Sequence, residues 1–118
     1  MKVLKHNDIV PKNLHGSDVY AYLDLAEGIV MRATTMAEGD VREEEKIPAE
    51  HVQLILKGEL RLTDKDGNQY SLQPLDAIGY VAGDYRKMEN VGKGEALILI
   101  VDHGSPHDKW GAGGPQKD

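Results

Sequence analysis

The sequence contains no cysteine, no phenylalanine and a single tryptophan. Without cysteine, the chain cannot form disulfides, thiolate nucleophiles or zinc–thiolate sites. Without phenylalanine, its core must consist of Leu, Ile, Val, Met and a few Tyr. No apolar run has the length of a membrane span, and residues 1–12 lack the apolar stretch of a secretion signal. These absences predict a cytoplasmic protein that does not associate with membranes.

The balance of charge narrows the range of partners. The chain has a formal net charge of −6, which disfavours nucleic acid and anionic membranes because both favour a basic protein face. A hydrophobic fraction of 40% is sufficient for a folded core, and a length of 118 residues suits one domain. We therefore expect one domain over residues 1–110, followed by a flexible, Gly-rich tail over residues 111–118.

Short apolar segments separated by turn signals run through most of the sequence. Their β-branched residues and their alternation of polar and apolar side chains favour strands. Residues 64–67 are typical of a hairpin turn, because Asp-Gly tolerates a positive φ. No segment has the pattern of an amphipathic helix, so the sequence predicts an all-β sandwich or barrel. The predicted strands cover residues 19–23, 28–36, 51–58, 59–63, 68–72, 76–81, 86–90 and 96–101. A short edge strand is also compatible with Val3, Leu4, Ile9 and Val10. The charge run 42–46 is predicted to be a solvated loop.

Two motifs with fixed spacing lie within these segments. The first runs from Gly39 to Gly58 and the second from Leu75 to Asn90. Their spacing and the order of the strands resemble the small single-domain cupins over about residues 28–102. The resemblance implies a single cupin β-barrel of jelly-roll type. The framework residues that match the family's spacing are Gly39, Gly58, Gly83 and Asn90.

The resemblance also implies where a metal would bind, and all four positions differ in this sequence. Cupins of this type hold one divalent metal with two histidines and a glutamate of the first motif and a histidine of the second. The matching residues here are Glu45, Ile47, His51 and Arg86. Ile47 has no donor atom and Arg86 stays cationic. We expect no metal cofactor, because two protein ligands rarely hold zinc or iron tightly; a divalent metal, if bound, would use Glu45 and His51.

The same positions outline a ligand pocket. Glu45 and Arg86 can form a charge-assisted pair, or Arg86 can clamp an anionic ligand. Strand alternation places His51 and Gln53 on one face, and Arg86 and Met88 on one face of a later strand. The expected ligand is a small polar or anionic molecule. The predicted ligand-binding residues are Glu45, His51, Gln53, Tyr80, Tyr85, Arg86 and Met88.

Three functions are compatible with this pattern. The first is a metal-free barrel that binds a small metabolite. The second is a metal-dependent isomerase, lyase or dioxygenase of a small organic acid, which would use Glu45, His51 and another donor. The third is a structural or partner-binding barrel without a ligand. Residues 102–108 contain two histidines and two aspartates and form another candidate metal site, and the resemblance implies a homodimer.

Overall fold

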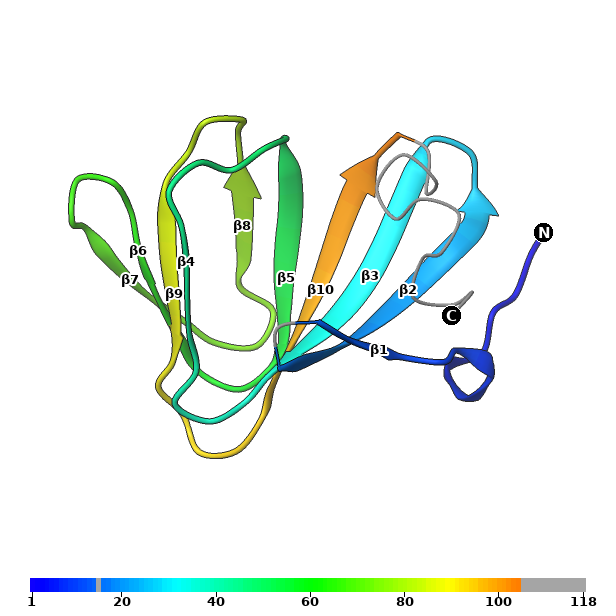
Figure 1. The fold of residues 1–118 in the computed structure, drawn as a ribbon, viewed down its shortest axis with the longest axis horizontal. Helices are drawn as coiled ribbons and strands as arrows, with labels where there is room; N and C mark the ends of the chain where they lie inside the picture. The colour runs from blue at the N-terminus through cyan, green and yellow to red at the C-terminus, as the bar shows by residue number, and fades with distance from the viewer. Residues whose placement is uncertain (15, 105–118) are drawn as a thin grey trace.

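The computed structural model describes residues 1–14 and 16–104, and these residues are almost entirely β. Within them, ten strands form two sheets that face each other (Figure 1). A single 3-10 turn, η1, precedes the strands in this part of the chain. The bounds are η1 His6–Asp8, β1 Lys12–Leu14, β2 Ser17–Ala26, β3 Ile29–Met36, β4 Val41–Glu44, β5 His51–Lys57, β6 Leu60–Thr63, β7 Gln69–Leu72, β8 Ala77–Tyr80, β9 Arg86–Asn90 and β10 Ala96–His103.

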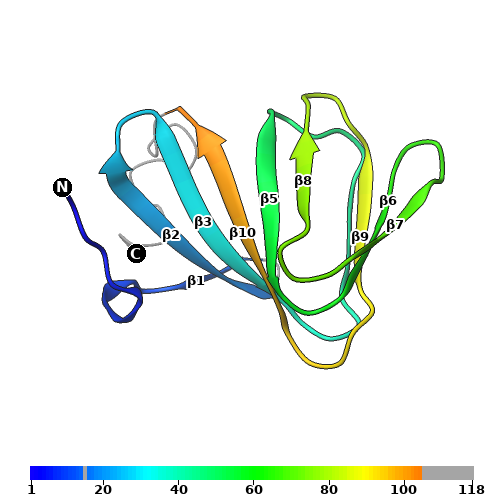
Figure 2. The same ribbon diagram turned by 180° about the vertical axis from the view of Figure 1, so that it is seen from behind.

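The order of strands in the two sheets is that of a jelly roll. The larger sheet has the order β1-β2-β3-β10-β5-β8 and the smaller one β4-β9-β6-β7. Every pairing is antiparallel. Strands far apart in the sequence, such as β3 and β10, are neighbours, because the chain crosses repeatedly from one sheet to the other (Figure 2). The predicted all-β barrel is therefore confirmed.

Two segments differ from the sequence-based prediction. The predicted edge strand around Val3 and Val10 is wrong: both side chains are exposed, and the chain there forms η1 before the short strand β1 pairs with β2. The charge run was predicted to be a loop, but its first residues form β4, which pairs with β9. An edge strand tolerates charge on both faces, because one side of its backbone stays in water.

The main hydrophobic cluster lies between the two sheets, and its members among the described residues are aliphatic side chains and methionines; the buried Tyr80 lies outside this cluster. Met36, Ile55, Leu60 and Met88 are its largest fully buried apolar members. Branched and flexible aliphatic side chains fill the space, as expected for a chain without Phe. The core fills one part of the barrel interior. Its packing holds in place strands that also carry inward polar residues. The predicted tail 111–118 lies outside the described residues.

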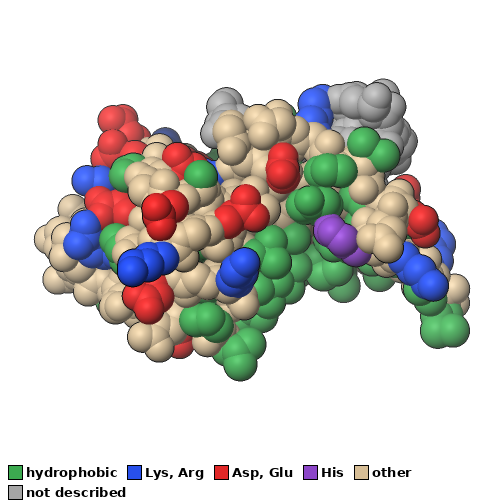
Figure 3. All heavy atoms as spheres, turned by 90° about the horizontal axis from the view of Figure 1, so that it is seen from below, with side chains coloured by type: hydrophobic (Ala, Val, Ile, Leu, Met, Phe, Trp, Pro, Cys, Tyr) green, Lys and Arg blue, Asp and Glu red, His purple; other side chains and the backbone are tan. Residues whose placement is uncertain are grey.

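The middle of the outer face of the larger sheet is apolar. The central outward positions on β3, β5 and β10 carry no charged side chain and several are partly exposed, whereas Lys57 and His103 stand at the ends of β5 and β10. Figure 3 shows hydrophobic side chains gathered in a hollow on the underside of the molecule. The central outward positions are Met31, Ala33 and Thr35 on β3, Val52, Leu54 and Leu56 on β5, and Leu97, Leu99 and Val101 on β10.

No helix among the described residues has the length and apolar character needed to cross a membrane.

Candidate functional site

Strand β4 brings its charged residues to the barrel interior in a register that differs from the prediction. Glu44 lies opposite Arg86 on β9, and Arg42 lies opposite the buried Met88. Arg42 and Glu44 therefore face inward, and Glu43 faces outward.

The predicted pairing of Glu45 with Arg86 is corrected by this register. Strand β4 ends at Glu44 and the chain bends at residues 45–46, so Glu45 leaves the alternation of the strand. Its side chain is exposed, and Glu44 takes the place next to Arg86.

A continuous chain of polar contacts links β4, β9 and β5. The Arg86 Nη2 atom donates to Glu44 Oε1 at 2.8 Å, and its Nη1 atom lies 3.5 Å from Gln53 Oε1. His51 Nδ1 donates to the Ala49 carbonyl oxygen at 2.9 Å, because a carbonyl can only accept. The other ring nitrogen of a neutral His51 then accepts from the Gln53 amide at 3.3 Å. The contacts fix both the histidine tautomer and the orientation of the amide.

Further charged residues around the barrel interior do not stand at any of the four metal-ligand positions of the motifs. Arg32 on β3 donates to Asp102 on β10 at 2.5 Å, and the Asp102 side chain is almost fully buried. Arg42 donates to the Thr35 carbonyl oxygen at 3.0 Å and lies 3.6 Å from the Asp40 carboxylate. A buried ion pair such as Arg32–Asp102 contributes little net stability but would be costly to break. The Arg32–Asp102 pair places two charged side chains at one side of the barrel interior.

These residues surround a cavity of about 480 Å³, which we call the arginine pocket. Three guanidinium groups and two carboxylates face it, so its charge is positive while the whole chain is negative. Burial is the main cause that lowers the pKa of Arg42; Asp40 opposes this effect and the positive charge of Arg86 adds to it. The lining residues are Leu14, Val19, Arg32, Thr34, Arg42, Glu44, Pro48, Ala49, His51, Gln53, Arg86, Ile100 and Asp102.

The three other predicted residues lie in different environments. Tyr80 is buried beside His51, with ring centroids 4.9 Å apart, and the Arg86 guanidinium carbon is 5.5 Å from the Tyr80 ring centroid. The Tyr85 hydroxyl donates to Glu43, on the outer side of β4. Met88 belongs to the hydrophobic core, because its position on β9 lies one step deeper than Arg86. It lines neither the arginine pocket nor the cavity on the other side of Arg86.

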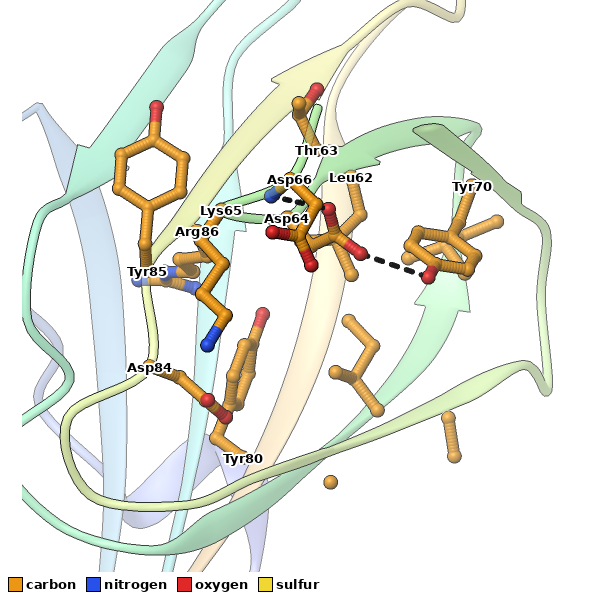
Figure 4. A pocket seen from close by; sticks show the side chains of 14 residues that line it. Leu62, Thr63, Asp64, Lys65, Asp66, Tyr70, Tyr80, Asp84, Tyr85 and Arg86 are labelled. Atoms are coloured by element: carbon orange, nitrogen blue, oxygen red, sulfur yellow. Dashed lines mark hydrogen bonds between the residues drawn. The ribbon is translucent and has the colours of Figure 1, made fainter. Parts of the chain in front are cut away.

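A second cavity of about 410 Å³ lies on the other side of Arg86, between the β6–β7 hairpin and β8. We call it the tyrosine pocket, because Tyr70, Tyr80 and Tyr85 line it (Figure 4). Arg86 belongs to the walls of both pockets. Its guanidinium therefore separates a charged compartment from a more apolar one.

The donor set of the arginine pocket does not fit a divalent metal. Glu44 and His51 are its candidate donors near Arg86, and the charges of Arg42 and Arg86 would repel a cation placed there. Over the described ranges, 1–14 and 16–104, no group of three or more His, Cys, Asp or Glu side chains could hold a metal ion.

The candidate metal segment 102–108 is described only as far as residue 104. Within that part, Asp102 is bound to Arg32, and His103 Nε2 lies 3.1 Å from Glu50 Oε1 at the surface. Residues 105–108, which include the second histidine and the second aspartate of this segment, lie outside the described residues.

Solved structures with this fold are numerous, although a scan against models of protein families and a search of curated proteins give no match. KdgF from Halomonas sp. is 10% identical, with a TM-score of 0.77 over 92% of this chain and 98% of KdgF. The polyketide cyclase RemF from Streptomyces resistomycificus is 17% identical, with a TM-score of 0.75 over 87% of this chain and 79% of RemF. The cupin domain of Drosophila melanogaster CENP-C is 13% identical, with a TM-score of 0.71 over 86% of this chain and 80% of that one.

These similarities establish the fold and nothing finer. The chain has the fold of a single cupin barrel of jelly-roll type, as the two motifs predicted. The same barrel occurs in a polyketide cyclase and in a domain of CENP-C, so the fold alone does not define an activity.

Proposed function

We propose that the protein binds a small anionic metabolite, such as a carboxylate or a sugar acid, in the arginine pocket without a metal ion. The observation that carries this proposal is the pair of inward guanidinium groups of Arg42 and Arg86, which line the same cavity close enough that the positive charge of Arg86 adds to burial in lowering the pKa of Arg42. An anion between them would neutralise that repulsion. Arginine is suited to this role because its planar donors match a carboxylate in two-point contact.

The remaining polar residues of the pocket suit recognition of a polar ligand. Glu44 neutralises only part of the positive charge, and Gln53 and His51 hold each other in defined orientations. A ligand hydroxyl could therefore meet the edge of a fixed amide or imidazole. Such pre-orientation reduces the entropy lost on binding.

The two alternatives remain distinguishable from this proposal. A metal-dependent isomerase, lyase or dioxygenase would require a third donor besides Glu44 and His51. A purely structural barrel would not require two arginines with adjacent inward charges, since each costs desolvation energy when buried.

The proposal predicts that small carboxylates raise the melting temperature of the protein. A ligand that binds only the folded state stabilises it in proportion to its concentration relative to Kd. Succinate, malate and glucuronate are suitable first probes, measured by thermal shift and then by calorimetry. Arg42→Gln and Arg86→Gln should each weaken binding by about tenfold or more, since a hydrogen bond to a charged group contributes about 1.5–3 kcal/mol.

The matched control is Arg61→Gln. Arg61 has the same side chain on the outward face of β6, where it pairs with Glu89, so its loss should leave the affinity unchanged. A thermal shift screen without any response would favour the structural alternative. A stoichiometric metal in protein purified without chelator, lost on His51→Ala, would favour the metal-dependent enzyme.

We also propose that two copies associate through the apolar outer face of the larger sheet. A second copy suits this face because its central outward positions are uncharged, whereas most other contacts between two chains of net charge −6 would bring like charges together. A patch of this kind is self-complementary about a twofold axis.

Light scattering should therefore give twice the mass of one chain. Leu99→Lys places a charge at the centre of the face and should yield monomers, because an unpaired charge is costly in an apolar interface. Val41→Lys on the outer side of β4, at the edge of the other sheet, is the control that should remain dimeric. A monomeric native protein, or a dimer that survives Leu99→Lys, would contradict the proposal.

A further inference from the structure

The tyrosine pocket contains two buried donors without an acceptor. The Tyr80 side chain is only 5% exposed, and apart from a contact with the Arg86 guanidinium its hydroxyl has no hydrogen-bond partner among the described residues, so its own proton has no acceptor. The Arg86 Nε atom is also buried and has no hydrogen-bond acceptor among the described residues. Both residues line the pocket, and Figure 4 shows the Tyr80 hydroxyl pointing into it. An unsatisfied buried donor is unfavourable, so the site is suited to an acceptor supplied from outside the chain.

Two of the three carboxylates at the pocket already have partners. The Asp64 carboxylate accepts from the backbone N–H groups of Asp66 and Asn68, from the Asn68 amide and from the Tyr70 hydroxyl. The Asp84 carboxylate accepts from the Val81 N–H at 2.9 Å. These contacts shape the turns at the rim. Among the described residues that line the pocket, Tyr80 and Arg86 have a buried polar atom that lacks a partner, and this makes them the groups best placed to select a ligand.

The body of the pocket is apolar and its rim is acidic. Leu62 and Leu72 from the hairpin and Ile78 from β8 form its apolar wall, together with the rings of Tyr70 and Tyr80. Three carboxylates, from Asp64, Asp66 and Asp84, stand at the rim against the single ammonium group of Lys65. Glu44 pairs with Arg86 and offsets part of its charge. This arrangement favours a neutral ligand over an anion.

The electrostatics of Tyr80 agree with a hydrogen-bond donor rather than a catalytic base. Burial is the main cause that raises the pKa of the Tyr80 hydroxyl, and the positive charge of Arg86 and a hydrogen bond from its guanidinium oppose it. The hydroxyl therefore keeps its proton at neutral pH and can donate it to a carbonyl or ether oxygen.

We propose that the tyrosine pocket is a second ligand site, which binds a neutral, flat, mostly apolar molecule whose carbonyl oxygen accepts hydrogen bonds from Tyr80 and Arg86. The apolar wall buries the body of the ligand, and the two unpartnered donors bind its oxygen. This site lies on the opposite side of Arg86 from the arginine pocket and does not depend on an anion there.

Two uncharged probes of nearly equal shape test the site. Acetophenone carries a carbonyl oxygen, and ethylbenzene lacks it. The native protein should bind acetophenone about tenfold or more tightly than ethylbenzene, because only the ketone satisfies the buried donors. Titration followed by protein NMR measures both affinities and locates the shifted residues.

Tyr80→Phe removes the hydroxyl and leaves the apolar wall. It should abolish most of the preference for acetophenone and also raise the melting temperature of the ligand-free protein, since an unsatisfied buried hydroxyl is gone. Tyr22→Phe is the matched control, because it removes a hydroxyl on β2 outside both pockets; the preference should persist in this variant.

The result that overturns the proposal is equal binding of the two probes, or no binding, in the native protein. The Tyr80 hydroxyl would then be served by a buried water molecule alone. A preference that survives Tyr80→Phe would also contradict it. Arg42→Gln separates this site from the anion site: it should weaken carboxylate binding and leave the affinity for acetophenone unchanged.

Discussion

Replacing Asn90 by alanine is expected to destabilise the fold by about 3 kcal/mol, roughly a hundredfold in the folding equilibrium, because the two N–H groups and the oxygen of its buried amide each lose hydrogen bonding of about 1 kcal/mol. The Asn90 side chain is 4% exposed. Its amide donates to the carbonyl oxygens of Met36, Ala37 and Gly94, and its Oδ1 atom accepts from the Gly92 N–H. One side chain thus joins the end of β3 to the turn between β9 and β10.

Urea unfolding measures this loss as a shift of the midpoint at a constant slope. Asn68→Ala is the matched control, since the exposed Asn68 amide donates only to the nearby Asp64 carboxylate; its effect should be below about 1 kcal/mol. If the two variants were equally stable, the buried amide would not be the link between these loops. Folded Asn90→Ala protein should still retain an intact arginine pocket, because Asn90 lines neither cavity.

Gly58→Ala is the second substitution with a large expected effect. Gly58 has a φ of +100°, and a Cβ atom there would lie 2.8 Å from Ala96 Cβ and 3.0 Å from Ala96 Cα. The clash involves backbone, so β5 would have to move away from β10. We expect a loss of about 3 kcal/mol, from about 1–2 kcal/mol for the left-handed conformation and a similar amount for the overlap.

The contribution of the overlap can be measured by comparison with Gly67→Ala. Gly67 also has a positive φ, +82°, but a Cβ atom there meets nothing within 4 Å. Its replacement should cost only the conformational part, about 1–2 kcal/mol. Thermal or urea unfolding of both variants gives the difference. Equal losses would show that β5 and β10 accommodate the extra methyl group without moving.

The fold was largely predictable because it depends on local patterns. Alternation along residues 51–58 and 86–90 identified β5 and β9, and it placed His51 with Gln53 and Arg86 with Asn90 on shared faces, as the structure shows. Turn residues marked the hairpin at 64–67. These signals depend on sequence neighbours, so they survive in a single sequence.

The identity of the Arg86 partner could not be predicted, because it depends on a difference of one residue. Counting from Gly39 selects Glu45, whereas pairing of β4 with β9 selects Glu44. A shift of one residue reverses the direction of a strand side chain. Alternation within residues 41–44 is the signal that could have found Arg42 and Glu44, had the charge run been considered as a strand.

The Arg32–Asp102 pair left no signal of this kind. The two residues are 70 positions apart and meet only because β3 and β10 are neighbours in the larger sheet. Adjacency of strands distant in sequence follows from the topology as a whole. Neither residue stands in the two cupin-like motifs, and Asp102 was considered only as part of the candidate metal segment 102–108, so only the three-dimensional arrangement assigns them to the arginine pocket.

The charged strand β4 also affects how copies of this barrel can meet. As the outer strand of the smaller sheet, β4 exposes unpaired backbone groups, which are a template for aggregation by strand addition. Glu43, Glu45 and Lys46 lie exposed along or just beyond this edge. A second β4 docking there would bring its own glutamates against them, and this repulsion opposes fibre-like growth from that edge. Arg42 and Glu44 line the arginine pocket on the inner side of β4. The same strand therefore also helps to keep the protein from polymerising.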